Sequence, residues 1–456
     1  MTQAEQHYKK MTETPVEKLI LSLSIPTIIS MLISNIYNLV DTYFVGTLGV
    51  SASGAVGVVF TLMSILQAIG FTLGHGAGSV TSRLLAQRDT DTASHYVSTS
   101  FFLALFMGLM LTILGIPLIS PLMRLLGSTE TILPYARDYG LYILLAAPVM
   151  VASLVLNNVL RYEGKAFYGM IGLTIGGVLN MIGDPIFIYG FDMGVAGAGL
   201  ATALSQLIGF LILLFMHRHH AQSKISIRNV RLKGWLVGDI VTTGMPSMIR
   251  QGMTSISSGI LNSCAGMYGD ACVSAMAITG RCQFFMLSIA LGIGQGFQPV
   301  AGFNYQAKKY ARLRRAFRFT MLSGIAVLMV VCGIGCIFAP QLVGLFQDDG
   351  EVLRIGSLAL RFASISLIFT PINIAPNMLF QTAGFKLRAL LTACLRSGVC
   401  FIPMLLILPP VLGELGIQLS QPIADITSSL ITIPFAVQFF RKIPREDVHV
   451  AMDDIA

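Results

Sequence analysis

Charged residues are scarce in this chain. Only 11% of its 456 residues are Asp, Glu, Lys or Arg, whereas a soluble domain usually carries about 25%. The mean hydropathy is +0.74, and 54% of the residues are hydrophobic. This balance excludes an ordinary soluble domain. Apolar runs of roughly 20 residues, the length that crosses hydrocarbon about 30 Å thick, recur along nearly the whole chain. We therefore expect an all-α polytopic membrane protein.

Twelve transmembrane helices are predicted from these runs. Their ranges are 18–45, 52–76, 94–120, 132–160, 166–190, 194–217, 235–266, 271–298, 316–340, 354–382, 388–409 and 415–440.

Cysteine is absent before Cys264. The seven cysteines all lie in apolar segments of the second half, without His or acidic partners at metal-ligand spacing, and we interpret them as small packing residues. The chain also lacks a Walker motif, a nucleophile elbow and a zinc signature. The run Gly74 to Gly78 follows no strand, so close helix packing explains it better than phosphate binding. These absences argue against an enzyme, and the polar first residues argue against a cleavable signal peptide.

Lys and Arg lie in alternate connections between the predicted helices. Such residues are retained on the cytoplasmic side of a membrane, so both termini are expected to be cytoplasmic, in the inner or plasma membrane. Topology thus accounts for the formal charge of +8, and no nucleic-acid partner is needed.

The chain repeats itself at an offset of 220 residues. This shift aligns Gly and Pro residues, which geometry constrains most; examples are Pro26 with Pro246, Gly49 with Gly269, and Gly164 with Gly384. Each half has six predicted helices, so we expect two pseudo-symmetric lobes in a parallel repeat around a V-shaped central cleft. The predicted divisions are an N-terminal lobe (1–217), a basic cytoplasmic linker (218–233), a C-terminal lobe (234–441) and a cytoplasmic tail (442–456).

Two carboxylates break the apolar pattern of the first half. Asp41 and Asp184 lie inside predicted helices, and the offset of 220 places Leu261 and Met404 at the matching positions of the second half. A charge in hydrocarbon costs at least a few kcal/mol. An ionisable residue kept there is therefore a functional candidate.

Three further polar residues are predicted at a similar depth. Asn180 shares a helix face with Asp184, and Tyr139 and Thr202 lie within roughly 12 Å of the same membrane boundary at 1.5 Å per residue. Five oxygen-bearing side chains could then form one cluster that takes a proton or a hard cation. The alternative is two separate acids, each satisfied by a structural partner. Pro185 should kink the helix beside Asp184.

Several motifs resemble the multidrug and toxic compound extrusion (MATE) transporters, over essentially all of residues 15–442. They include SIPTIISMLISNIYNLVDTYFVGTLG, LGHGAGSVTSRLLAQRD, LRYEGKAF and LNMIGDPIFIYGFDMGVAGAGLATALSQ. The acid closing YNLVD and the LNxxxDPxFIYG motif look like the bacterial DinF-like and MepA-like branch.

This resemblance implies an exporter that exchanges small cationic amphipathic drugs for H⁺ or Na⁺ by alternating access, with no other cofactor. Asp41, Asn180, Asp184 and Thr202 match the family's proton and cation site, with Tyr139 adjoining it. The family's substrate cleft corresponds to Tyr37, Asn157 and Gln206. A monomer in the lipid bilayer is expected, and protons are favoured over sodium because two acids and a tyrosine suffice for them.

The second half carries arginines at membrane depth. Arg281, Arg396 and Asp425 resemble features of the MepA-like branch and form a possible charge network, whereas Arg250 matches nothing in the resemblance. A structural pairing of Asp425 with one arginine is favoured over a second coupling site. The arginines also leave open a lipid-linked precursor or oligosaccharide flippase. A receptor or scaffold is the third hypothesis, which the repeat and the buried acids disfavour.

Overall fold

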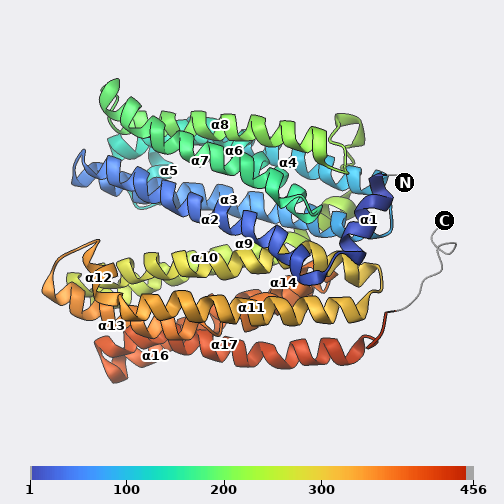
Figure 1. Ribbon diagram of the computed structural model, residues 1–456. Helices are drawn as coiled ribbons and strands as arrows, with labels where there is room; N and C mark the ends of the chain where they lie inside the picture. Colours follow the sequence, from blue (N-terminus) through green and yellow to red (C-terminus); the bar gives the residue numbers. More distant parts are fainter. Residues whose placement is uncertain (1–2, 448–456) are drawn as a thin grey trace. The chain divides into compact units, whose positions relative to one another are not determined.

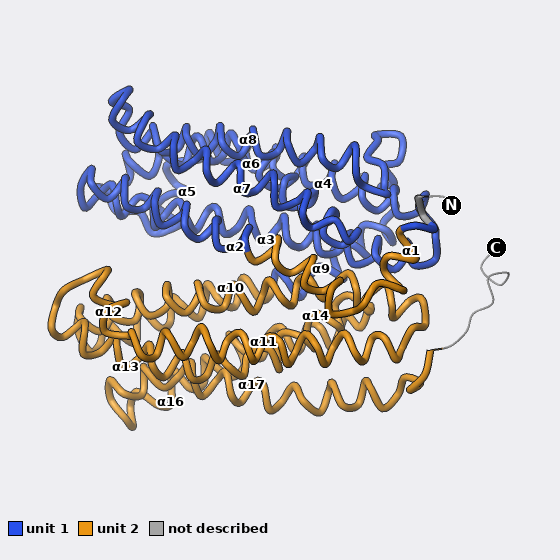
Figure 2. The backbone as a smooth tube through the Cα atoms, viewed as in Figure 1, with its two compact units in different colours: residues 1–6, 29–248 blue, residues 7–28, 249–456 orange. Residues whose placement is uncertain are grey.

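A computed structural model describes residues 3–447, and all regular elements in this range are helices. Contacts divide the chain into two compact units (Figure 2), residues 1–6 and 29–248 in unit 1 and residues 7–28 and 249–456 in unit 2. A short helix, α1 (Gln3–Glu13), precedes the membrane-length helices (Figure 1). The bounds of the next helices are α2 (Val16–Gly46), α3 (Val50–Ala86), α4 (Thr90–Gly115), α5 (Ile119–Leu125), α6 (Leu133–Tyr162), α7 (Ala166–Pro185), η1 (Ile186–Gly190), α8 (Val195–His220) and η2 (Ile227–Asn229).

The second half follows a similar order, with α13 and α14 in the place of α6 and with α16 between η3 and α17. Its elements are α9 (Gly234–Gly266), α10 (Asp270–Gln306), α11 (Tyr310–Ile337), α12 (Ala339–Gly344), α13 (Gly350–Leu367), α14 (Pro371–Ala383), α15 (Lys386–Cys394), η3 (Leu395–Cys400), α16 (Phe401–Leu412) and α17 (Glu414–Lys442).

The predicted repeat is confirmed residue by residue. Helices α3 and α10 are both 37 residues long and begin 220 residues apart. Gly49 and Gly269, which precede them, both have positive φ, 125° and 101°, and Gly164 and Gly384 have 72° and 88°. Only glycine adopts such angles without strain. The same turn geometry is therefore built twice.

The described residues contain ten helices long and apolar enough to cross a membrane, or eleven if α13 and α14, bent by 52° to each other, form one span. The predicted span at 235–266 corresponds to α9, a helix of 33 residues. It is not apolar enough to be counted, because it carries polar residues such as Arg250, Thr254 and Ser257. The number twelve stays a prediction.

Helix α3 extends ten residues beyond its predicted end at residue 76, so the Gly74 to Gly78 run lies inside a helix. A Cβ atom added at Gly76 would lie 2.0 Å from the backbone oxygen of Ile240 in α9. This contact confirms that the run serves close helix packing.

Helix α6 is the centre of unit 1. It packs against α3, α4, α7 and α8, and 72% of its most apolar stretch is buried. Residues such as Ile143, Val151 and Leu156 are fully buried along it. Polar residues on the buried face of α6, such as Tyr139, therefore lie where water has little access.

The predicted linker begins with helix, since α8 runs to His220. We call residues 221–231 the strap. Its Ser223 backbone N–H donates to the Glu163 Oε1 at 3.1 Å, its Lys224 N–H to the Ser94 Oγ at 2.9 Å, and its Arg231 N–H to the Thr99 Oγ1 at 2.9 Å. These bonds attach the strap to the ends of α4 and α6.

The chain passes between the two units inside α1, after Gln6, inside α2, after Ile28, and inside α9, after Met248. Pro26 and Pro246, equivalent in the repeat, each lie two residues before such a passage. The predicted lobe boundaries stay a prediction.

Candidate functional site

Five predicted residues come together in unit 1. Asp41 comes from α2, Tyr139 from α6, Asn180 and Asp184 from α7, and Thr202 from α8. All are buried, and the Asp184 side chain is fully so. We call these residues the acid cluster. The structure thus brings together side chains that are up to 161 positions apart (Asp41 to Thr202).

Hydrogen bonds connect the acid cluster. The Tyr139 hydroxyl donates to the Asp41 Oδ2 at 2.8 Å and lies 3.5 Å from the Thr202 Oγ1. The Asn180 Nδ2 donates to Thr202 at 3.1 Å and to the Asp184 Oδ1 at 3.4 Å. A continuous chain of polar contacts therefore joins the two carboxyl groups.

Three oxygen atoms of the acid cluster are buried without a hydrogen-bond donor among residues 3–447. They are the Asp41 Oδ1, the Asn180 Oδ1 and the Asp184 Oδ2. Buried polar atoms in proteins nearly always have a partner. Oxygen acceptors of this kind suit a proton or a hard cation such as Na⁺. No basic side chain forms an ion pair with either acid in this range.

Glycines bring the helices of the acid cluster close together. A Cβ atom added at Gly199 of α8 would lie 3.1 Å from the backbone oxygen of Tyr139, and one at Gly177 of α7 would lie 2.9 Å from the Ile33 side chain of α2. The absence of a side chain at these positions lets α8 approach α6 and lets α7 approach α2. The distances between Thr202, Tyr139 and Asp41 depend on these approaches.

The helix changes its winding directly after Asp184. After Pro185, where a kink is predicted, α7 passes into the π-helical η1, Ile186–Gly190. A π turn accommodates the missing backbone donor of proline by a wider hydrogen-bonded ring, and such turns are frequent at functional sites. At its far end the Tyr189 hydroxyl lies 2.5 Å from the Thr47 Oγ1. The segment beside Asp184 is therefore joined to the end of α2.

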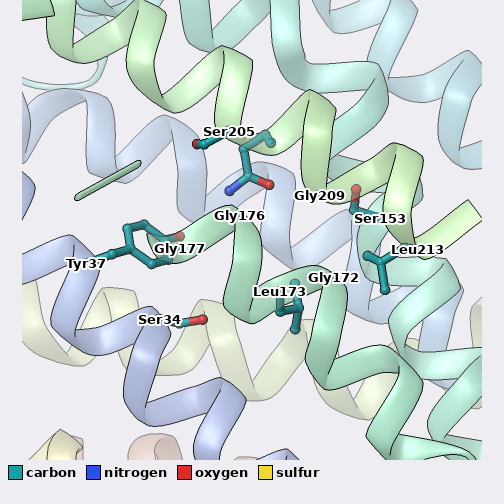
Figure 3. Close-up of a pocket in the computed structure, with 11 residues that line it drawn as sticks. Ser34, Tyr37, Ser153, Gly172, Leu173, Gly176, Gly177, Ser205, Gly209 and Leu213 are labelled. Carbon is teal, nitrogen blue, oxygen red and sulfur yellow. The ribbon is translucent and has the colours of Figure 1, made fainter. Parts of the chain in front are cut away.

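Two of the three predicted cleft residues line a small cavity in unit 1 (Figure 3). Tyr37 and Gln206 are part of its wall, together with Ser34 and Ser205. Asn157 does not line it; its side chain lies against Gly169. The cavity measures about 30 Å³, enough for water but far below the 300 Å³ or more of a drug-sized pocket. Sequence reasoning missed Ser34 and Ser205 because small polar residues are common in packed helices.

In unit 2 the structure pairs only part of the predicted charge network. The Arg396 Nε donates to the fully buried Asp425 Oδ1 at 2.8 Å, and Ser366 and Gln421 also donate to that carboxylate. Arg281 is exposed and has no carboxylate partner within residues 3–447. Arg250 donates to the Asn377 Oδ1 at 3.1 Å. Asp425 is thus saturated by donors, in contrast to the acid cluster.

Membrane-length helices, an internal duplication and buried acids in one half together define the class of polytopic membrane transporters. The MatE family model matches residues 26–186 and again residues 246–407, two segments whose starts are 220 residues apart. The chain belongs to this family, the MATE transporters.

Similar proteins agree with this membership. The multidrug export protein MepA of Staphylococcus aureus (strain MRSA252) is 28% identical over 417 residues, covering 91% of this chain and 92% of the relative. MepA of Staphylococcus saprophyticus is 27% identical, covering 92% and 93%. This outcome matches the expected MepA-like branch.

Solved structures of transporters have the same fold. An outward-facing multidrug resistance MATE family transporter superimposes with a TM-score of 0.90 at 26% identity, covering 97% of this chain and 99% of the other. A transporter of the MOP superfamily from Pyrococcus furiosus gives 0.89 at 26%, covering 96% and 98%; reversed polarity of its binding pocket is described as suggesting a different function.

Proposed function

We propose that this chain is a secondary active antiporter that exports small cationic amphipathic compounds in exchange for H⁺ or Na⁺, by alternating access and without a chemical reaction. The acid cluster carries the proposal. Two carboxyl groups from different helices lie in one buried polar network, and three of its oxygens have no donor within the described residues. The relatives of this chain include proteins named for multidrug export, which supports drug-like compounds as the exported cargo.

The bound ion would neutralise the acid cluster. Two buried carboxylates without a basic partner are costly in a membrane, so protonation or cation binding stabilises this arrangement of α2, α6, α7 and α8. Loss of the ion leaves charge that favours a different arrangement with more access to water. Binding energy that differs between two arrangements is what couples an ion gradient to transport.

The Tyr139 hydroxyl links Asp41 to the rest of the acid cluster. It donates to Asp41 and lies near Thr202, which in turn accepts from Asn180. A proton arriving at either carboxyl group would therefore change the hydrogen bonds of the other through three side chains, Tyr139, Thr202 and Asn180. We propose protons as the ion, with Na⁺ held by Asp41, Asn180, Asp184 and Thr202 as the alternative.

The site of the exported compound is proposed at Tyr37, Asn157 and Gln206. The cavity beside Tyr37 and Gln206 is water-sized here, so cargo binding there requires it to widen. We further propose that the protein acts as a monomer in the plasma membrane, with both termini in the cytoplasm and no nucleic-acid partner.

Transport by purified protein in proteoliposomes tests the proposal. Efflux of ethidium, a fluorescent cationic compound, is measured under an imposed pH gradient and separately under an imposed Na⁺ gradient. Asp41→Asn and Asp184→Asn should each abolish gradient-driven efflux while the protein still inserts and elutes as a single species. Asp192→Asn, an exposed acid in the turn between η1 and α8, is the matched control and should transport normally. Normal transport by both cluster variants would end the proposal.

A lipid-linked precursor or oligosaccharide flippase is the second candidate. Arg281 is exposed at membrane depth and has no carboxylate partner among the described residues, which suits an anionic cargo. The transporter from Pyrococcus furiosus has the same fold, and the reversed polarity of its binding pocket is described as suggesting a different function, which keeps a cargo of opposite charge under consideration for this chain. Stimulated movement of a lipid-linked anionic sugar across the liposome, with no ethidium efflux, would decide for it.

A further inference from the structure

A second concave surface lies in unit 2, far in sequence from the acid cluster. Helix α14 packs against both α11 and α17, and a groove of about 560 Å³ runs over it between them. Its walls are apolar at helical spacing: Phe317, Met321 and Ile325 from α11, and Ile433, Val437 and Phe440 from α17. Each row spans about 11 to 12 Å at 1.5 Å per residue.

One end of the groove is strongly basic. Arg314 in the second turn of α11, Arg441 in the last turn of α17 and Arg445 just beyond it all line that end. None of the three has a carboxylate within 4 Å among residues 3–447. The acids nearest in the chain are Glu446 and Asp447, and neither lines the groove. Glu446 is exposed and forms no ion pair with the three arginines within residues 3–447, and Asp447 accepts from the Ala311 N–H at the start of α11. The positive charge at this end is therefore left for a ligand.

Arg314 is held in place by the end of α17. Its guanidinium donates to the carbonyl oxygens of Phe440 and Ile443, the latter at 2.8 Å, and lies 5.3 Å from the centre of the Phe440 ring. Its Nε is buried and has no hydrogen-bond acceptor within the described residues. Arg314 is thus held in one position at the wall of the groove, in contrast to a mobile surface charge.

The opposite end of the groove faces apolar surroundings. Ile433 and Val437 are 40% and 42% exposed although they belong to a membrane-length helix. A ligand that fits both ends needs a negative head and a hydrocarbon chain of about 12 Å. Basic pockets between membrane helices on the cytoplasmic side commonly bind anionic lipid head groups.

We propose that this groove binds an anionic phospholipid, with the phosphate against Arg314, Arg441 and Arg445 and an acyl chain along the α11 and α17 walls. The site is separate from the acid cluster and independent of what the protein transports. It would make stability sensitive to the lipid composition around unit 2.

Lipid binding to the purified full chain tests this. Affinities for dioleoyl phosphatidylglycerol and dioleoyl phosphatidylcholine are compared in detergent by native mass spectrometry. Wild type should prefer phosphatidylglycerol, and R441Q/R445Q should lose about thirtyfold in affinity for it, from the contribution of each basic residue near anionic lipid. K9Q/R218Q removes two exposed charges outside the groove and should keep the preference.

A second variant tests the apolar part without removing charge. Ala436→Trp should obstruct the groove that Ala436 lines and weaken phosphatidylglycerol binding, while binding of soluble glycerol phosphate stays unchanged and weak. Equal binding of the two lipids by wild type, or equal loss in K9Q/R218Q, would overturn the proposal. So would glycerol phosphate that binds as tightly as the lipid.

The chain's own tail is the competing occupant, because residues 448–456 include Asp453 and Asp454. Phosphatidylglycerol binding that appears only in D453N/D454N would assign the groove to the tail and overturn the lipid proposal. Equal binding by wild type and D453N/D454N supports it.

Discussion

Among the described residues, the hydroxyl of Tyr139 is the only hydrogen-bond donor to Asp41. Tyr139→Phe should lower the free energy of unfolding by about 1–3 kcal/mol, since a buried carboxyl oxygen then loses its hydrogen bond. It should also slow ethidium efflux more than it weakens ethidium binding. Thermal unfolding in detergent and transport in proteoliposomes measure the two effects. Tyr135→Phe, on an exposed position of the same helix, serves as the control; equal effects of both changes would contradict this role.

Asp425 in unit 2 behaves as a structural acid. Asp425→Asn breaks its pair with Arg396 and should cost about 3–5 kcal/mol, because a largely buried arginine is left without a counter-charge. Ion-coupled efflux at a permissive temperature should persist. By contrast, Glu130→Gln removes an exposed pair with Arg124 and should cost at most about 1 kcal/mol. Loss of coupling in Asp425→Asn without loss of stability would assign a second coupling site.

At the scale of elements, the contact between η1 and α8 holds the segment beside Asp184. A Cβ atom at Gly197 would lie 2.7 Å from the backbone carbonyl of Phe187, whereas one at Gly190 would meet nothing within 4 Å. Gly197→Ala should therefore destabilise the protein by about 1–3 kcal/mol through overpacking and reduce efflux. Gly190→Ala, on the other side of the same turn, should do neither. Thermal unfolding and efflux assays on the two variants distinguish overpacking at Gly197 from an effect that any Gly→Ala change in this turn would have.

The strap gives a pH-dependent prediction. Burial raises the pKa of the Glu163 carboxyl above its ordinary value of 4.5, although the Gln222 and Ser223 N–H groups oppose this. The folded chain thus holds this proton more tightly than the unfolded one. The contribution of Glu163 to the free energy of unfolding is therefore fully present below about pH 4.5. It is lost as the pH rises through the raised pKa of the folded state.

Variants of Glu163 test this linkage. Glu163→Gln keeps an oxygen acceptor without the charge and should flatten the pH dependence of the unfolding temperature. Glu163→Ala leaves the strap N–H groups without a partner and should expose the strap to trypsin at Lys224 and Arg228. A wild-type unfolding temperature that rises with pH from 5 to 8, or a protease-resistant Glu163→Ala, would contradict the account.

At the scale of the whole molecule, orientation is the prediction to test. Single cysteines at Thr129 and Lys233, both exposed, lie on opposite sides according to the distribution of Lys and Arg. In a background where the partly buried Cys282, Cys336 and Cys394 are replaced by alanine, a membrane-impermeant maleimide should label residue 129 in intact cells. Residue 233 should be labelled only after permeabilisation. The reverse pattern would invert the topology.

Sequence reasoning recovered most of the fold for two reasons. The thickness of the membrane sets the length of the apolar runs, and the geometry of the turns fixes the Gly and Pro positions that reveal the 220-residue repeat. The same reasoning also found the acid cluster, since Asp41 and Asp184 are conspicuous in apolar surroundings and helix rise fixes depth. It could not find the hydrogen-bond order through Tyr139 and Asn180, which depends on helix rotation and on close approaches at Gly199 and Gly177.

Other features left weaker signals. The π turn after Pro185 is a rearrangement of the backbone hydrogen bonds that no residue type specifies. Arg281 and Arg396 look alike in the sequence, and only packing decides that Asp425 meets Arg396. The strap has the composition of a flexible linker, yet the serines and threonine of α4 that receive it are ordinary helix residues by themselves.

Apart from α1 near the start of the chain, two long helices and not the strap carry the chain between the units. Each is weakened at an equivalent place, because Pro26 and Pro246 cannot donate the hydrogen bond that a helix interior requires. The backbone of α2 and of α9 therefore lacks one hydrogen bond close to the point where the chain leaves one unit for the other. The duplication has placed this missing bond at equivalent positions of both halves, so a change at either proline is expected to alter the stiffness of its helix.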